Sequence, residues 1–260
     1  MTMALLDHPG GAIEYVAYPG REDGPTAVLL HEGLGSVGQW GRFPQSFAGR
    51  TGLPTVVYSR HGYGGSGGCG PDGPRYLHRQ AREVLPWVLN RLGIGAPPVL
   101  VGHSDGASIA TVYGAEFPVH TLVLIAPHIV VEEITIGGIR QTASTFAVAT
   151  QPALRLHHDS PRALFDRWSG VWLSEEFRAE FDLTGCLPTI AAPQLVIQGE
   201  YDNYGSRRQL ELIAEHTSGP TSISLLPGTG HHPHLDETDK VLDLICATLK
   251  SAGRVRESHG

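Results

Sequence analysis

The stretch of this chain that decides the fold is Gly102-His103-Ser104-Asp105-Gly106. It follows the apolar run 98–101 and precedes residues 107–113, which are mostly small or apolar. A buried strand, a serine flanked by glycines and a helix, in that order, are typical of a nucleophile elbow. The change from strand to helix within a few residues strains the serine backbone and leaves no room for neighbouring β-carbons, so glycines are expected there.

A second stretch of the chain, Gly64-Gly65-Ser66-Gly67-Gly68, has the same spacing of glycine and serine. No helical pattern follows it, because residues 69–74 are rich in glycine and proline. We therefore expect Ser66 to be a loop serine, and Ser104 to be the candidate nucleophile.

Composition restricts the class of protein. The chain has 260 residues and a formal net charge of −7, which fits one α/β domain with an insertion and argues against a nucleic-acid partner. No apolar stretch approaches the ~20 residues of a membrane helix, so no membrane partner is expected. The three cysteines are widely spaced, and residues 1–10 lack the features of a signal peptide. These features predict reduced thiols and a cytoplasmic location.

Strand and helix patterns alternate along most of the chain. Residues 13–18, 26–30, 55–58, 99–101, 121–125, 194–197 and 222–226 have the composition of strands, and most are buried runs. Helical spacing separates several of them, at 75–92 (with Pro86 predicting a kink), 105–116, 206–216 and 235–250. The alternation predicts an α/β fold whose mostly parallel, doubly wound sheet has helices on both faces.

The alternation stops between residues 127 and 190, where helix-like segments at 160–173 and 174–181 carry several aromatic side chains. We interpret residues 127–190 as an inserted helical cap and residues 1–126 and 191–260 as the core. Residues 254–260 are expected to form a frayed tail.

Three predicted strand ends carry residues for nucleophilic catalysis. Ser104 needs an oriented base, because a serine hydroxyl is a poor nucleophile at neutral pH. Asp202 follows the strand at 194–197, and His231 follows the last strand in a glycine-rich loop. The carboxyl ends of parallel strands meet at one edge of a sheet, and the order Ser, Asp, His is that of a catalytic triad known on such sheets.

These motifs resemble the α/β-hydrolase superfamily over nearly the whole chain. His31 to Ser36 resembles the family's oxyanion loop, Arg60 to Ser66 its glycine-rich loop, and Gly230 to His234 its catalytic histidine loop. The resemblance implies the α/β-hydrolase fold, with Ser104 as nucleophile, His231 as base and Asp202 as the acid that orients it. It also implies an oxyanion hole formed by the backbone N–H groups of Gly33 and Asp105, and no cofactor.

Each assignment has an alternative. His232 and His234 compete with His231 as the base, and Glu200 competes with Asp202 as the acid. The histidines, together with Asp236 and the pair 157–158, are an alternative metal site, although we expect none. His103 is expected to pack within the fold rather than to act in catalysis.

Two acids depart from the family pattern. Glu32 stands where many relatives have glycine, and Asp105 follows the nucleophile where an uncharged residue is common. The structural interpretation is that Asp105 stabilises a helix start and Glu32 accepts loop N–H groups. The functional alternative is that one of them faces the pocket and disfavours substrates bearing a carboxylate.

A tentative substrate pocket completes the prediction, formed by Glu32, Leu34, His128, Trp168 and Trp172. For the tryptophans, packing of the cap onto the sheet is the alternative to a roof over the substrate. We expect a hydrolase that cleaves a small or medium apolar ester or related acyl compound. One alternative is carbon–carbon bond hydrolysis of a diketone-type ring-cleavage product, and another is a non-catalytic small-molecule-binding protein. The sequence makes no prediction of oligomeric state.

Overall fold

The apolar runs of the sequence form one sheet in the computed structural model, which describes residues 2–21 and 23–257, with side chains up to residue 253. Within these residues the sheet has eight strands in the order β1-β2-β4-β3-β5-β6-β7-β8. Strands β1 and β2 are antiparallel to their neighbours, and all strands from β3 onward are parallel. The strands are β1 (Thr2–Leu6), β2 (Ile13–Tyr18), β3 (Ala27–Leu30), β4 (Thr55–Tyr58), β5 (Val99–His103), β6 (Thr121–Ile125), β7 (Gln194–Gly199) and β8 (Thr221–Leu226).

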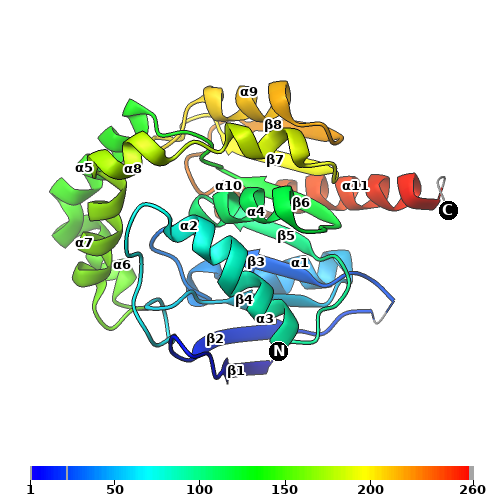
Figure 1. The fold of residues 1–260 in the computed structure, drawn as a ribbon, viewed down its shortest axis with the longest axis horizontal. Helices are drawn as coiled ribbons and strands as arrows, with labels where there is room; N and C mark the ends of the chain where they lie inside the picture. Colours follow the sequence, from blue (N-terminus) through cyan, green and yellow to red (C-terminus); the bar gives the residue numbers. More distant parts are fainter. Residues whose placement is uncertain (1, 22, 258–260) are drawn as a thin grey trace.

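Helices cover both faces of the sheet, so the central strands are apolar on both sides (Figure 1). In β3, Val28 and Leu30 belong to one core cluster and Ala27 and Leu29 to the other. The first face is covered by α2 (Tyr76–Arg79), α3 (Leu85–Arg91), α4 (Asp105–Glu116) and α9 (Arg207–His216), the second by α1 (Phe43–Thr51) and α11 (Thr238–Glu257). The predicted α/β class and doubly wound sheet are confirmed.

The chain between β6 and β7 contributes no strand to this sheet, and we call residues 126–193 the β6–β7 insertion. Figure 1 shows its helices gathered at one end of the sheet, where β6 ends and the insertion begins. Its elements are α5 (Glu133–Thr145), the π-helical turn η3 (Phe146–Thr150), α6 (Gln151–Leu154), α7 (Pro161–Trp172), α8 (Glu175–Glu180) and the 3-10 turn η4 (Thr184–Thr189).

The kink expected at Pro86 takes the form of a π-helical turn, η2 (Gln80–Val84), between α2 and α3. Proline lacks an N–H and its ring clashes with the carbonyl four residues earlier in a regular helix. The wider π turn ends just before the proline, which then occupies the first turn of α3, where the missing N–H is tolerated.

Three expectations from the sequence were wrong at the termini. The edge strand β1 was missed, because its short run is mostly exposed and shows no alternation. The last helix is divided into α10 (Pro233–Asp236) and α11 at Glu237, which leaves the helical conformation. Helix α11 then continues to Glu257 through part of the expected frayed tail, because this stretch contains no proline to stop it. Residues 258–260 of that tail lie outside the described residues.

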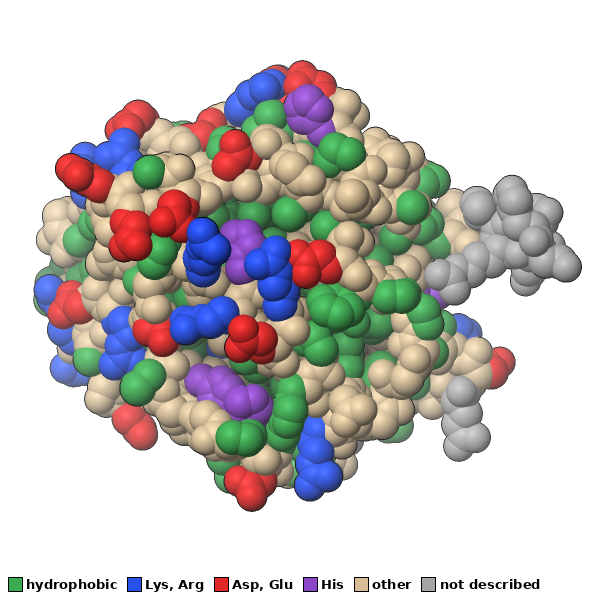
Figure 2. Space-filling view, in the orientation of Figure 1, with side chains coloured by type: hydrophobic (Ala, Val, Ile, Leu, Met, Phe, Trp, Pro, Cys, Tyr) green, Lys and Arg blue, Asp and Glu red, His purple; other side chains and the backbone are tan. Residues whose placement is uncertain are grey.

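Acidic and basic side chains are interspersed on the face drawn in Figure 2. Several form ion pairs between segments, such as Arg82 with Glu116 and Arg75 with Glu180. Among the described residues, no helix combines the length and the hydropathy that crossing a bilayer requires.

Candidate active site

Ser104 occupies a tight turn between β5 and α4. Its backbone has φ 54° and ψ −116°, a conformation that L-residues rarely adopt. The flanking glycines are required because other backbone atoms lie close to them. A β-carbon added to Gly102 would lie 2.3 Å from the carbonyl oxygen of Gly106, and one added to Gly106 would lie 1.9 Å from the carbonyl oxygen of Leu30. The turn thus has the strained geometry that the glycine and serine spacing predicts. Ser66, by contrast, lies in a loop and bonds the Glu14 N–H and the Ser59 carbonyl.

His231 and Asp202 form a hydrogen-bonded pair in the loops that follow β8 and β7. The His231 Nδ1 lies 2.9 Å from Asp202 Oδ1 and 3.0 Å from Oδ2. The Tyr204 N–H donates to Asp202 Oδ1 at 2.8 Å. Burial raises the pKa of Asp202, but the charge and hydrogen bond of His231 and the Tyr204 N–H outweigh it and lower the pKa to about 2. Asp202 is therefore ionised and accepts the hydrogen bond of His231 Nδ1–H, which leaves Nε2 as the acceptor nitrogen of the ring.

The competing residues have other partners. Glu200 is exposed and accepts a hydrogen bond from the Gly228 N–H. His234 is buried among the rings of Trp40, Phe43 and His103. His103 is also buried, and its Nε2–H donates to the His231 carbonyl at 2.7 Å. This hydrogen bond holds the backbone of the histidine loop.

Two further histidines of the alternative metal site, His158 and His232, have different surroundings. Both ring nitrogens of His158 are engaged: Nδ1 accepts from the Gly64 N–H, and Nε2 donates to the Leu34 carbonyl and Gln39 Oε1. His232 borders the same cavity as His231. Its side chain thus lies beside the base position without the aspartate contact that His231 has.

Gly33 and Asp105 lie in the loop after β3 and at the start of α4. Within residues 2–21 and 23–257, neither backbone N–H has an acceptor. Gly33 is packed so closely under an indole that an added β-carbon would lie 2.2 Å from Trp168 Nε1. Trp168 therefore packs directly against the loop that carries the Gly33 N–H.

The two unusual acids have different surroundings. Asp105 lies in the first turn of α4, where a negative charge is favourable to the helix dipole. Its carboxylate is fully buried and binds Arg60 Nη1 at 3.2 Å and the Tyr76 hydroxyl at 2.6 Å. The place of Asp105 in the first turn agrees with the structural interpretation, and its carboxylate also forms a buried ion pair with Arg60.

Glu32 accepts the Leu34 N–H at 2.5 Å, as the structural interpretation expected, and it also borders the cavity. Burial, partly offset by the Leu34 N–H, raises the pKa of Glu32 to about 7. Of the two acids, Glu32 is therefore the one that borders the cavity.

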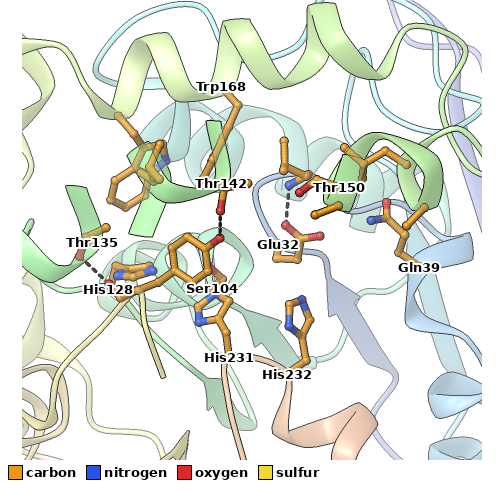
Figure 3. A pocket seen from close by; sticks show the side chains of 17 residues that line it. Glu32, Gln39, Ser104, His128, Thr135, Thr142, Thr150, Trp168, His231 and His232 are labelled. Carbon is orange, nitrogen blue, oxygen red and sulfur yellow. Dashed lines mark hydrogen bonds between the residues drawn. The ribbon is translucent and has the colours of Figure 1, made fainter. Parts of the chain in front are cut away.

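A cavity of about 330 Å³ opens above Ser104 between the sheet and the β6–β7 insertion (Figure 3). Ser104 and His231 both line it, together with all five residues of the tentative pocket. The remaining residues come mainly from the insertion, and those of the insertion carry no motif that the sequence could reveal. They are Thr135, Ile139, Thr142, Ala149, Thr150, Ala153 and Leu154 from the insertion, with Gln39, Tyr204 and His232 from the core.

Tyr204 links the insertion to the Asp202 loop. Its hydroxyl lies 2.5 Å from the Thr142 hydroxyl, and its carbonyl accepts the Thr135 hydroxyl at 2.5 Å (Figure 3). Its ring contacts the ring of His231, with centroids 4.7 Å apart. The only sequence signal for Tyr204 was its place two residues after the predicted acid.

The sheet order, the strained serine turn and the ends of β7 and β8 together define the α/β-hydrolase fold. The model of the alpha/beta hydrolase family matches residues 27–244, and the chain belongs to this family.

Among curated proteins, the chain is 26% identical to the polyketide synthase ThaQ of Burkholderia thailandensis. The match covers 100% of this chain but only 13% of the length of that protein.

Among solved structures, the chain is similar to the enol-lactonase from Burkholderia xenovorans LB400 (TM-score 0.69, 18% identity, covering 95% of this chain and 100% of that one). It is also similar to a thermophilic esterase from Thermogutta terrifontis (TM-score 0.68, 18% identity, covering 97% and 99%). At these identities the likeness shows the shared fold.

Proposed function

We propose that this chain is a serine hydrolase that cleaves a small or medium, largely apolar ester or related acyl compound. The observation that carries the proposal is the hydrogen-bonded Asp202–His231 pair, whose histidine lines the same cavity as Ser104 in its strained turn. The proposed oxyanion hole consists of the Gly33 and Asp105 N–H groups. Residues 127–190 are proposed to act as a cap over this site.

The proposed mechanism begins with proton transfer. His231 Nε2 takes the proton of the Ser104 hydroxyl as the serine oxygen attacks the substrate carbonyl, and ionised Asp202 stabilises the imidazolium. The two N–H groups bind the developing oxyanion, which is worth about 3–4 kcal/mol per donor in related chemistry. Collapse expels the alcohol, which receives the proton from His231. Water, activated by His231, then hydrolyses the acyl-enzyme.

The cavity supports the substrate class. Its volume of about 330 Å³ limits the substrate to a small or medium molecule. Leu34, Ile139, Leu154, Trp168 and Trp172 supply apolar walls for an acyl chain. The names of the two solved neighbours, an esterase and an enol-lactonase, agree with an ester-type bond, although they share only the fold.

The direct test is a panel of p-nitrophenyl esters with acyl chains of two to twelve carbons, measured with the wild-type protein and Ser104→Ala. We expect activity on short and medium chains that falls at least 10³-fold in the variant. Diketone ring-cleavage substrates belong in the same panel. Turnover of these alone would favour carbon–carbon bond hydrolysis, and binding without turnover of any compound would favour a small-molecule-binding protein.

A further inference from the structure

The side chain of Arg60 connects the two segments that carry the proposed oxyanion-hole donors. Arg60 follows β4 and is only 2% exposed. Its Nη2 donates to the Glu32 carbonyl at 2.7 Å, and its Nη1 donates to the Asp105 carboxylate at 3.2 Å. One guanidinium thus contacts the peptide next to Gly33 and the side chain of the residue after Ser104.

The contact with Glu32 determines where the Gly33 N–H points. The Glu32 carbonyl and the Gly33 N–H belong to the same planar trans peptide, so they point in opposite directions. The carbonyl accepts three hydrogen bonds: from Arg60, from His31 Nδ1 at 2.7 Å and from the Gly35 N–H at 3.1 Å. His31 Nε2 accepts the Arg60 backbone N–H at 3.0 Å, so the proton of neutral His31 is on Nδ1 and donates to this carbonyl.

Arg60 is the charged member of these three donors. A cation bound to the carbonyl polarises the peptide and strengthens its N–H as a donor, because hydrogen bonds in a chain reinforce one another. The Asp105 carboxylate neutralises the buried charge of Arg60. It is itself held by the Tyr76 hydroxyl, which in turn accepts from Trp172 Nε1 at 2.8 Å. A chain of hydrogen bonds therefore connects Arg60 in the glycine-rich loop to Trp172 in the insertion.

We infer that Arg60 is a positioning residue that orients and polarises the Gly33 N–H toward the oxyanion and ties it to the start of α4. The inference rests on the oxyanion hole of the proposed function. A buried ion pair is by itself weak support for stability, since apolar residues of similar size often replace such pairs without loss. Its use here is to keep a donor pointing at charge that develops only in the transition state.

The test compares Arg60→Met and the double variant Arg60→Met/Asp105→Asn, which leaves no unpaired buried carboxylate. Arg82→Met is the matched control, because Arg82 is an exposed arginine paired with Glu116. With p-nitrophenyl butyrate, we expect kcat to fall 10- to 100-fold in the Arg60 variants while KM changes less than threefold. The control should keep the wild-type kcat.

A second measurement distinguishes a specific loss of the oxyanion hole from a general disordering of the site. Phenylboronic acid forms a tetrahedral adduct with the serine and uses the oxyanion hole, whereas benzamide binds without reaction. We expect the Arg60 variants to weaken inhibition by phenylboronic acid at least tenfold and by benzamide less than threefold. Equal losses for both inhibitors, or an unchanged kcat in a folded double variant, would overturn the inference.

If neither variant folds, Arg60→Lys takes their place, because its compact ammonium keeps the charge but cannot reproduce both guanidinium contacts. A lower kcat at unchanged KM is again expected, and a wild-type kcat would refute the role. Ester hydrolysis that is absent from the wild-type protein, or that survives in Ser104→Ala, would instead overturn the proposed function and this inference with it.

Discussion

At the scale of single residues, the site depends on backbone positions that only glycine tolerates and on acids with unusual surroundings. Ser104 keeps a rarely populated conformation, which costs about 1–3 kcal/mol and persists because β5, α4 and the flanking glycines enforce it. Glu32, next to the proposed donor Gly33, lies at the cavity, whereas the side chain of Asp105, itself a proposed donor, is buried against Arg60. The two acids therefore have different surroundings.

Replacement of Gly106 by alanine tests the tight turn. The added β-carbon would lie 1.9 Å from the backbone oxygen of Leu30, which cannot move without disrupting β3. We expect Gly106→Ala to lower the free energy of unfolding by at least about 3 kcal/mol in urea titrations, or to prevent folding. Gly137→Ala is the control: its β-carbon meets nothing within 4 Å on the exposed side of α5, so a gain of about 0.5–1 kcal/mol is expected. Equal effects of both substitutions would contradict this account.

Replacement of Glu32 by glutamine tests its proposed effect on substrate charge. The probes are p-nitrophenyl butyrate and the p-nitrophenyl monoester of succinic acid, which differ mainly in a carboxylate. Since the pKa of Glu32 is raised to about 7, the wild-type preference for the neutral ester should increase from pH 6 to pH 8 as Glu32 ionises. Glu32→Gln should remove this pH dependence and reduce the preference three- to tenfold, or about 1 kcal/mol. An unchanged ratio of the two kcat/KM values would exclude the role of Glu32.

At the scale of elements, the carboxyl ends of β3, β5, β7 and β8 bring the site residues together, and the insertion completes the cavity. The strand ends were predictable, because apolar runs and the turn residues after them mark each one. The insertion helices were only partly predictable: α7 and α8 have clear starts at Pro161 and at the Ser174 cap, but α5, η3 and α6 were missed. Contacts such as Tyr204 with Thr142 join residues 62 positions apart and leave no local pattern.

The Tyr204–Thr142 bond predicts how firmly α5 is held over the site. Tyr204→Phe removes this partly buried hydrogen bond, so we expect a loss of about 1 kcal/mol in stability and faster amide hydrogen exchange in residues 133–145. Ser144→Ala, an exposed change on the same helix, should leave exchange unchanged. If both variants exchange like the wild type, the bond does not anchor the insertion.

At the scale of the whole molecule, the doubly wound sheet with helices on both faces was predictable from the sequence, whereas the polar network around the site was not. Arg60 belonged to a recognisable loop, but its contacts with Glu32 and Asp105 depend on three loops meeting in space. The same packing buries several histidines. Burial lowers the pKa of His31, His103 and His234 well below the usual value, so they are neutral in the folded protein.

These histidines predict an acid-sensitive fold. Their folded-state pKa values are below the unfolded value of about 6.5, so the unfolded chain binds more protons and stability is lost as pH falls below about 6.5. We expect the free energy of unfolding in urea to decrease by a few kcal/mol between pH 7 and pH 5. His234→Phe keeps a ring against Trp40 and Phe43. It should reduce the pH dependence of the free energy of unfolding by the contribution of about one bound proton. An unchanged slope would show that His234 is not responsible.

The central claim, that Ser104 is an activated nucleophile, is tested most directly by reaction with a fluorophosphonate probe followed by intact-mass measurement and peptide mapping. We predict one adduct per chain on Ser104, no adduct on Ser104→Ala, and labelling at least 10²-fold slower in His231→Ala. The Ser66→Ala variant should be labelled like the wild type, provided that it folds. An unmodified wild-type protein, or an adduct that persists in Ser104→Ala, would contradict the account.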